Sequence, residues 1–299
     1  MFTGCGTALV TPFKNDLSLD EATLRSLLRR QIAEGINFLV PCGTTGESPT
    51  LTHREHLRVV EITLEEAKGK TPVLVGAGGY NTAEVISLAN ELKTMGADGI
   101  LSVTPYYNKP TQEGLYEHYK AIATAVSLPI IVYSVQGRTG VNVEPSTLQR
   151  LAKIDYIVGV KEASGNISQM ASVMYQVPED FIVLSGDDAI AIPLIALGGK
   201  GIVSVVSNQI PKQMTQLAQL ALANDFEAAR KIQREYFPLM EINFIESNPI
   251  PVKAAMALMG LLEPVYRLPM VPPSAANLAK IENVLDGLGL LAGRTVHAG

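Results

Sequence analysis

Short apolar runs alternate with longer segments of helical periodicity along the first two thirds of this chain, and no Pro/Ser-rich linker interrupts them. The runs are rich in Val, Ile and Leu, which indicates strands buried on both faces, as in parallel sheets covered by helices. Eight βα units within about 205 residues predict a closed (β/α)8 TIM barrel of the α/β class, rather than an open doubly wound sheet. The predicted strands are residues 7–10, 38–40, 73–76, 99–103, 130–133, 157–161, 182–185 and 201–205.

Two of the intervening helices carry start signals. Ser18 with Glu21, and Thr52 with Glu55, match the capping box. In that motif two side chains satisfy backbone N–H groups that the first helical turn leaves unpaired. We therefore expect one helix to begin after Ser18 and another after Thr52.

After Ser207 the strand pattern stops, and the remaining spacing predicts only helices, around residues 214–223, 226–244, 252–259 and 275–288. Residues 1–224 are expected to form the barrel and residues 225–299 an appended helical module. The apolar positions of this tail would let it pack on the outside of the barrel or against another subunit. They include Leu222, Phe226, Ala229, Ile232, Phe237 and Met240.

Composition narrows the class of protein. Of the 299 residues, 47% are hydrophobic and 18% charged, which suits a large folded core. The net charge of -5 and the lack of a basic run argue against a nucleic-acid partner. We find no signal peptide and no apolar run near the roughly 20 residues of a membrane span, so we expect a cytoplasmic protein without a membrane partner. Cys5 and Cys42 lie beside predicted strands and are expected to be reduced core thiols.

Lys161 ends the apolar run of the sixth predicted strand. The active site of such a barrel lies at the carboxyl ends of its strands, so polar residues that end a run are the candidates for chemistry. Partial loss of hydration there would disfavour the ammonium form and leave more neutral amine, which attacks carbonyl groups. On this feature alone, a lysine that merely reaches into solvent is the commoner case, so other residues must support the assignment.

Further polar residues follow neighbouring strands. Tyr133 ends the fifth strand, where a phenol suits proton transfer, although an ordinary exposed aromatic is equally compatible. Thr44 and Thr45 stand between glycines after the second strand and could turn backbone N–H groups toward a carboxylate, a weak pattern that many turns share. Arg138 follows the fifth strand, where its planar guanidinium suits a second carboxylate or, alternatively, a surface salt bridge.

The sequence offers no sign of a metal or a nucleotide. His53 and His56 are three residues apart, but no third ligand stands at metal-site spacing and no H-E-x-x-H motif occurs. No G-x-G-x-x-G follows a strand, and no G-x-x-x-x-G-K occurs. We therefore expect no metal and no cofactor. An aldolase without a metal must stabilise its carbanion as an imine, and a lysine supplies that route.

Taken together, these strand-end motifs resemble the dihydrodipicolinate synthase family over essentially the whole chain. They are Gly43-Thr44-Thr45-Gly46-Glu47, Pro105-Tyr106-Tyr107-Asn108-Lys109-Pro110, Tyr133, Gly137-Arg138-Thr139-Gly140 and Val160-Lys161-Glu162. Relatives in the wider superfamily, such as N-acetylneuraminate lyase, share the lysine and the tyrosine but generally not the arginine. Arg138 and the Tyr106-Tyr107-Asn108 stretch therefore favour the synthase, which fold alone could not decide. A sister pyruvate aldolase or lyase is the close alternative, and a non-catalytic metabolite-binding barrel is the alternative from another class.

The resemblance implies a condensation of pyruvate with L-aspartate 4-semialdehyde in the lysine and diaminopimelate pathway. Lys161 would form an imine with pyruvate, Tyr133 would move protons at the imine, and Thr45 with Tyr107 would relay them to solvent. In the family the residue matching Tyr107 comes from a neighbouring subunit, so the resemblance also implies a homotetramer built from dimers. The substrate-binding residues would be Thr44 and Thr45, through backbone N–H groups, and Arg138, Gly186 and Val203.

Two departures from the family change these expectations. The family commonly has Asn-Val-Pro before the arginine loop, whereas this chain has Ser134-Val135-Gln136-Gly137, and loss of the proline is expected to free the loop around Arg138. Many members are inhibited by L-lysine at the dimer interface, and a bulkier Tyr80 in place of an asparagine would fill that effector pocket. We therefore expect weak or absent inhibition by L-lysine. The matching positions are Ser48, His53, His56, Glu84 and Tyr106, with Pro49 in place of an alanine.

Overall fold

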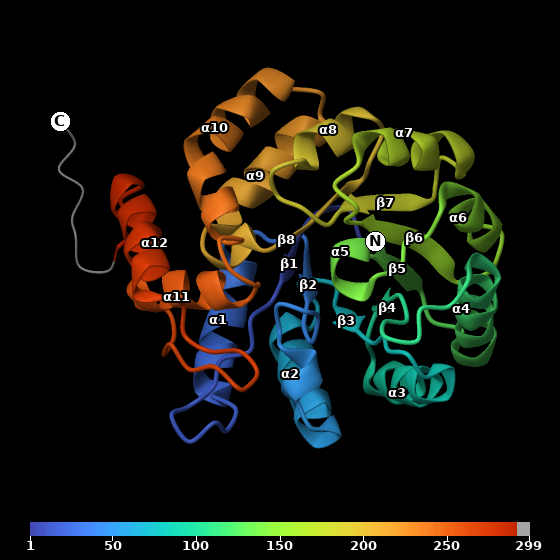
Figure 1. Ribbon diagram of the computed structural model, residues 1–299, viewed down its shortest axis with the longest axis horizontal. Coiled ribbons are helices and arrows are strands. Elements are labelled where there is room, and N and C mark those ends of the chain that lie inside the picture. Colours follow the sequence, from blue (N-terminus) through green and yellow to red (C-terminus); the bar gives the residue numbers. More distant parts are fainter. Residues whose placement is uncertain (292–299) are drawn as a thin grey trace.

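The eight predicted strands form one closed ring at the centre of the molecule (Figure 1). A computed structural model describes residues 1–291, in which all strands are parallel and follow the order β2-β1-β8-β7-β6-β5-β4-β3. A bridge between Leu39 and Val73 joins the two ends of that order, so the ring closes and the predicted (β/α)8 barrel is confirmed. The strands are β1 (Gly4–Ala8), β2 (Phe38–Val40), β3 (Leu74–Gly76), β4 (Gly99–Val103), β5 (Ile130–Ser134), β6 (Ile157–Glu162), β7 (Ile182–Ser185) and β8 (Gly201–Ser204).

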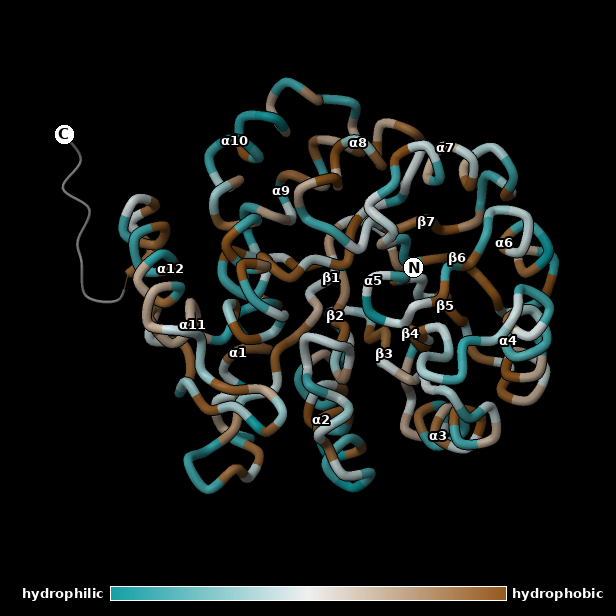
Figure 2. Tube along the Cα trace, in the orientation of Figure 1, coloured by the Kyte–Doolittle hydropathy of each residue, from teal (hydrophilic) through white to brown (hydrophobic). Residues whose placement is uncertain are grey.

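Helices surround this ring, and each βα unit buries apolar residues on both faces of its strand. Figure 2 shows hydrophobic residues concentrated along the strands and hydrophilic ones along the outer helices. One buried cluster fills the barrel interior and a larger one lies between strands and helices. The helices are α1 (Glu21–Ala33), α2 (His53–Ala67), α3 (Thr82–Met95), α4 (Gln112–Val126), α5 (Gln136–Thr139), α6 (Pro145–Leu151), α7 (Ile167–Gln176), α8 (Ala191–Ala196), α9 (Pro211–Leu222), α10 (Phe226–Ile242), α11 (Ile250–Leu258) and α12 (Ala275–Gly287), with 3-10 turns η1 (Ser48–Thr50) and η2 (Val206–Asn208).

The first strand begins three residues earlier than the apolar pattern predicts. β1 starts at Gly4, which pairs with Gly201 of β8, and it ends at Ala8. Glycines have a low strand propensity, so the pattern did not include this segment. They are required here because a Cβ on Gly6 would lie 2.0 Å from the Phe38 ring. Close packing in the barrel, rather than propensity, therefore determines where β1 begins.

One of the two predicted capping boxes is present. At the start of α2, Thr52 Oγ1 accepts from the Glu55 amide and the Glu55 carboxylate accepts from the Thr52 amide, as predicted. The prediction for Ser18 and Glu21 is wrong, because Asp20 caps α1 by accepting from the Thr23 amide. Asp20 stands directly before the helix, whereas the Ser18 hydroxyl donates to Asp16 in the preceding turn.

The C-terminal helices lie along one side of the barrel, as predicted for an appended module (Figure 1). α10 packs beside α8 and α9, and Val252 and Met256 of α11 share a buried cluster with Leu27 of α1. Ala229 and Met240 of α10 are buried in the main core, whereas Phe237 remains 43% exposed. The tail therefore packs on the outside of the barrel with only part of its apolar surface.

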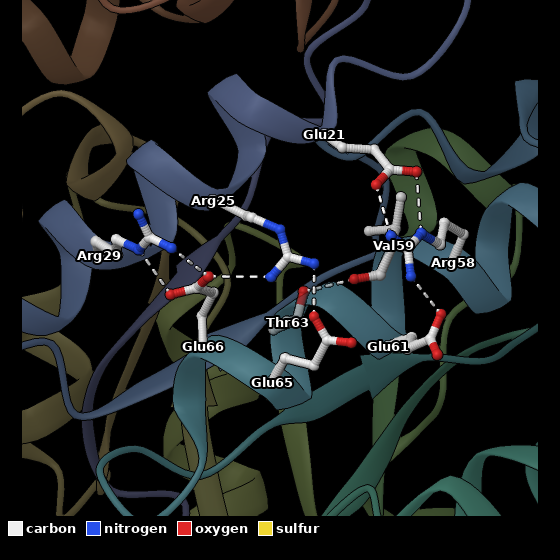
Figure 3. A network of polar contacts seen from close by, with 9 residues as sticks. All are labelled: Glu21, Arg25, Arg29, Arg58, Val59, Glu61, Thr63, Glu65 and Glu66. Carbon is white, nitrogen blue, oxygen red and sulfur yellow. Dashed lines mark hydrogen bonds and ion pairs between the residues drawn. The ribbon is translucent and has the colours of Figure 1, made fainter.

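An ion-pair network joins the outer surfaces of α1 and α2 (Figure 3). Arg25 and Arg29 of α1 both bind Glu66 of α2, with N–O distances of 2.8–3.0 Å. At the other end, Arg58 of α2 binds Glu21 of α1 at 2.6 Å. Because two arginines share the carboxylate of Glu66, which is 12% exposed, these bonds form a network and not isolated surface pairs.

Two further expectations concern the class of protein. Cys5 and Cys42 are buried and form no disulfide, as predicted. Burial raises the pKa of both thiols well above the ordinary value, which keeps them protonated. Within residues 1–291, no helix has the length and apolar character needed to cross a lipid bilayer.

Candidate active site

Lys161 and Tyr133 lie side by side at the carboxyl ends of β6 and β5. They are register partners, and Lys161 Nζ lies 4.1 Å from the centroid of the Tyr133 ring. Side chains alternate along a strand, so these two point into the barrel, while Glu162, the next residue of β6, points outward and binds Gln169 of α7. Both Lys161 and Tyr133 are buried. The structure thus places an amine and a phenol against each other inside the barrel mouth.

Gly186, directly after β7, leaves the space that the lysine occupies. A Cβ at Gly186 would lie 3.0 Å from Lys161 Cε and 2.6 Å from the Ala163 Cβ. Lys161 opens into a cavity of about 160 Å³ that residues from several strand ends and from the C-terminal segment line. Its polar lining includes Thr44, Thr45, Tyr133, Arg138, Asp187 and Asn248. Val203 lies beneath this lining, in the buried cluster of the barrel interior, and Val205 lines the cavity instead.

The loop after β2 presents backbone donors to this cavity. The amides of Gly46 and Glu47 donate to the carbonyls of Gly43 and Thr44, which closes a tight turn. Among the described residues, the amides of Thr44 and Thr45 make no hydrogen bond, and both residues line the cavity. Two adjacent unpaired N–H groups suit an anion such as a carboxylate. This arrangement agrees with the role that the sequence suggests for Thr44 and Thr45.

The two threonine hydroxyls face different surroundings. Thr45 Oγ1 accepts a hydrogen bond of 2.9 Å from Asn248 Nδ2. Both threonines line the lysine cavity, but only Thr44 also lines a second cavity, which adjoins the first through Gly43, Leu101 and Tyr133. The hydroxyl of Thr44 is therefore better placed than that of Thr45 to connect Tyr133 with a group outside the barrel.

Tyr107 does not reach the cavity of its own chain. Its side chain is 90% exposed, and it does not line the cavity around Lys161. Its backbone has a φ of 68°, in the left-handed region. A non-glycine residue in that conformation is uncommon. A role for Tyr107 in this chemistry would therefore need a second subunit.

The segment around Arg138 forms a short helix that local hydrogen bonds hold. Residues 136–139 form the short helix α5, and Thr139 Oγ1 is hydrogen-bonded to the carbonyls of Val135 and Val141 and to Thr104 Oγ1. These local bonds constrain the segment, and the expectation of a freed loop stays a prediction. Arg138 lines the cavity mouth and donates to the Asn248 carbonyl at 3.4 Å.

Two residues of the C-terminal segment, which the sequence did not single out, contact the Thr44-Thr45 loop. Asn248 binds Thr45, and Lys253 Nζ lies 2.6 Å from Glu47 Oε1. The side chains of Lys253 and Glu47 are 0% and 1% exposed, so this ion pair is fully buried. The tail was interpreted only through its apolar spacing. Polar residues beside two prolines, at 247–251, were the one local signal that this stretch is not an ordinary helix.

The positions that match the family's lysine site lie just outside the barrel mouth. Ser48, His56 and Tyr106 line the second cavity, and His53 and Glu84 line a neighbouring hollow. The Tyr80 ring packs edge-on against Tyr106, with the ring centroids 5.2 Å apart. His53 Nε2 lies 3.0 Å from Glu91 Oε2. Within residues 1–291, no three His, Cys, Asp or Glu side chains gather in a way that could hold a metal ion.

Comparisons with known proteins agree with this geometry. Residues 1–287 match the model of the Dihydrodipicolinate synthetase family. A 4-hydroxy-tetrahydrodipicolinate synthase of Koribacter versatilis is 54% identical over 294 residues, covering 98% of each chain. The crystal structure of dihydrodipicolinate synthase from Thermotoga maritima superposes with a TM-score of 0.95 at 47% identity, covering 97% of this chain and 100% of the other.

Two further solved structures carry ligands. The enzyme from Acinetobacter baumannii, complexed with pyruvate, has a TM-score of 0.96 at 42% identity and covers 97% of this chain and 100% of its own. The one from Cyanidioschyzon merolae, with lysine bound, has a TM-score of 0.92 at 38% identity and covers 97% of this chain and 99% of its own. Fold, strand-end residues and sequence identity over nearly the full length lead to one conclusion. This chain belongs to the Dihydrodipicolinate synthetase family of enzymes.

Proposed function

We propose that this protein catalyses the 4-hydroxy-tetrahydrodipicolinate synthase reaction, the Schiff-base condensation of pyruvate with L-aspartate 4-semialdehyde. The observation that carries the proposal is the buried amine of Lys161 beside Tyr133, inside a cavity that also has unpaired amides and an arginine. An amine in such a cavity is a nucleophile for a keto acid, and the two sets of donors suit two carboxylates. The same reaction is named for the relative from Koribacter versatilis.

The first half of the reaction concerns pyruvate. The Lys161 amine attacks the ketone carbon and water leaves, giving an imine. The imine withdraws electrons, so a methyl proton can be removed to give an enamine. Tyr133 is the proton carrier nearest to the lysine, and the amides of Thr44 and Thr45 hold the carboxylate. Because Thr44, unlike Thr45, also lines the second cavity beside Tyr133, we assign the next position in the proton relay to Thr44 rather than Thr45.

The second half joins the two substrates. The enamine carbon attacks the aldehyde, and the alkoxide that forms takes up a proton. The amino group of the adduct then attacks the imine carbon, closes the ring and releases Lys161 as the free amine. Arg138, at the cavity mouth, would hold the carboxylate of the semialdehyde through its planar guanidinium. One water is released in total, at the imine step, and the product is 4-hydroxy-tetrahydrodipicolinate.

Borohydride trapping and coupled turnover test this function together. Pyruvate with borohydride should add a pyruvyl mass to Lys161 irreversibly, and Lys161→Ala should abolish both that mass and turnover. Arg138→Ala should raise the KM for the semialdehyde or lower kcat, and should leave pyruvate trapping intact. Lys200→Ala is the matched control, because Lys200 precedes β8 at the opposite end of the barrel. Absence of any trapped mass would indicate a binding protein, and activity only with N-acetylmannosamine would indicate a lyase.

The proposal includes an assembly and a location. Tyr107 is exposed and absent from its own cavity, which supports a relay completed by a neighbouring subunit in a homotetramer built from dimers. The reaction belongs to lysine and diaminopimelate biosynthesis, and we place it in the cytoplasm with the metabolites that it uses.

Regulation by L-lysine is proposed to be weak. Tyr80 packs against Tyr106, one of the positions that match the effector site, and so occupies space beside it. We expect L-lysine in the micromolar range to leave turnover unchanged in the wild type, and Tyr80→Asn to make the enzyme more sensitive. A lysine titration of both proteins measures this. Micromolar inhibition of the wild type would contradict the proposal.

A further inference from the structure

Asn248 presents a buried acceptor that no group within residues 1–291 uses. The residue lines the cavity around Lys161, and its Nδ2 donates to Thr45 Oγ1. Its other side-chain atom, Oδ1, is buried and has no hydrogen-bond partner in the described part of the chain. A buried carbonyl oxygen without a partner is destabilising, and such atoms are rare in native proteins. A donor from a bound molecule would remove that penalty.

Asn248 also stands directly beside the arginine of the cavity. Arg138 Nη2 donates to the main-chain carbonyl of Asn248 at 3.4 Å, and this is the one hydrogen bond that the Arg138 side chain makes within residues 1–291. The guanidinium and the unpaired amide oxygen therefore come from two residues that contact each other and both line the cavity. Together they offer an anion site next to an acceptor.

This pairing matches the head group of an α-amino acid. Such a group carries a carboxylate and an ammonium on one carbon, and each needs a partner of opposite character when water is removed. A sugar aldehyde or a simple aldehyde acid has no ammonium to place against an acceptor. Asp187 is a second acceptor in the cavity lining, but its Oδ1 already accepts from the Ala189 amide at 2.9 Å.

We propose that Asn248 determines specificity for the second substrate, by accepting a hydrogen bond from its α-ammonium at Oδ1 while Arg138 binds its α-carboxylate. The inference rests on the proposed function and extends it, since it explains how the enzyme distinguishes an amino-acid aldehyde from other aldehydes. It also gives the C-terminal segment a direct part in substrate recognition.

The test compares two aldehydes that differ only in the amino group. L-aspartate 4-semialdehyde is used as the substrate, and succinate semialdehyde as a competitive inhibitor against it. The ratio of the inhibition constant to the KM measures the preference for the ammonium. A hydrogen bond to a charged group predicts that Asn248→Leu lowers this ratio by about tenfold or more. The constant for succinate semialdehyde should change little.

Matched variants separate recognition from a general disturbance. Thr45→Val removes the partner of Asn248 Nδ2 but leaves Oδ1, so both constants should change together and the ratio should persist. Pyruvate trapping on Lys161 shows that each variant is folded and forms the imine. If Asn248→Leu does not fold, Asn248→Ser, which removes the same oxygen with a smaller side chain, takes its place.

Two outcomes would overturn the inference. One is an unchanged ratio in a folded, trappable Asn248 variant. The other is a ratio that collapses in Asp187→Asn and persists in Asn248→Leu, which would assign the ammonium to Asp187. Failure of the proposed function is distinct from both, because the wild type would then show no turnover of L-aspartate 4-semialdehyde at all.

Discussion

At the scale of single residues, the ion pair of Lys253 and Glu47 carries a high desolvation cost. Both side chains are buried, Glu47 Oε2 has no partner in the described residues, and Lys253 Nζ also lies 4.5 Å from the Phe13 ring centroid. Burial lowers the pKa of Lys253, and the Glu47 carboxylate opposes that shift. Buried charges contribute stability only while both partners remain.

Removing one partner of this pair should therefore be severe. Lys253→Met leaves Glu47 buried without a counter-charge and should lower the free energy of unfolding by about 3–5 kcal/mol. The double variant with Glu47→Leu should recover part of that loss. Lys231→Met is the matched control, because its pair with Glu227 is 74% and 78% exposed, and it should change stability by about 0.5 kcal/mol or less. Urea unfolding measures all three; equal losses in Lys253→Met and Lys231→Met would contradict the prediction.

His118 should make stability depend on pH. Its ring is buried, with Nδ1 2.9 Å from Thr82 Oγ1, and burial lowers its pKa from 6.5 to about 4. A lowered pKa favours the neutral form in the folded state. The contribution is therefore complete above pH 6.5 and is lost as the pH falls toward 4, by about 3 kcal/mol in total.

The comparison with His118→Asn isolates this effect. Asp188 acts with the opposite sign, because burial raises its pKa to about 6 and its contribution is lost as the pH rises from 3.8 to 6. His56, with a pKa also lowered to about 4, adds to the wild-type slope. Between pH 6.5 and 4, the free energy of unfolding, measured with urea, should fall less steeply with pH in the variant than in the wild type. The difference in slope should correspond to the binding of about one proton. Parallel curves for the two proteins would refute the assignment.

At the scale of elements, the ends of helices show what a local motif can and cannot predict. Thr52 and Glu55 form their capping box, and the Glu55 carboxylate also binds Arg267 from the C-terminal segment. The Arg267 hydrogen bond lowers the pKa of Glu55 to about 2. Ser18 and Glu21 have the same spacing but form no box, because Asp20, which stands directly before the helix, caps it in place of Ser18. The motif therefore needs the residue that stands directly before the helix.

This difference is measurable by substitution. Thr52→Ala and Asp20→Ala each remove a side-chain acceptor from a first-turn amide and should lower the free energy of unfolding by about 1 kcal/mol. Ser18→Ala, which removes only a hydroxyl bond within a surface turn, should change it by a few tenths at most. Thermal unfolding of the three variants gives the order. A Ser18→Ala loss as large as that of Asp20→Ala would restore the capping box that the sequence predicted.

At the scale of the whole molecule, the cavity is assembled from segments that are far apart in the chain. Thr45 and Asn248 are separated by 203 positions, and Glu47 and Lys253 by 206. The helical tail therefore closes one side of the site instead of only covering the barrel. Tyr107, which is 90% exposed, extends the same idea to a second subunit.

Mixing two impaired variants tests that extension. Tyr107→Phe should be slow, and Lys161→Ala should be inactive. In a hybrid dimer, the Lys161→Ala subunit would supply an intact Tyr107 to the cavity of its partner. A 1:1 mixture that is dissociated and reassembled should therefore regain about a quarter of wild-type sites, since half of the dimers are hybrid and each has one complete cavity. Activity no higher than the sum of the separate variants would place Tyr107 outside the relay.

The sequence by itself determined the barrel of eight successive βα units and the residues at the ends of its strands, such as Lys161 and Tyr133. Those features are local, because apolar alternation and a polar residue at the end of a run are properties of neighbouring positions. Even so, Gly4 to Gly6 escaped the pattern, since a glycine-rich strand is favoured only by the packing around it.

Only the tertiary structure decided which hydroxyl meets which partner. Thr44 and Thr45 are equivalent as sequence, yet one lines two cavities and the other binds Asn248. The burial of Lys253 with Glu47 likewise has no local signal. Such contacts depend on how distant segments pack together, and packing is a property of the closed fold that no short stretch of sequence contains.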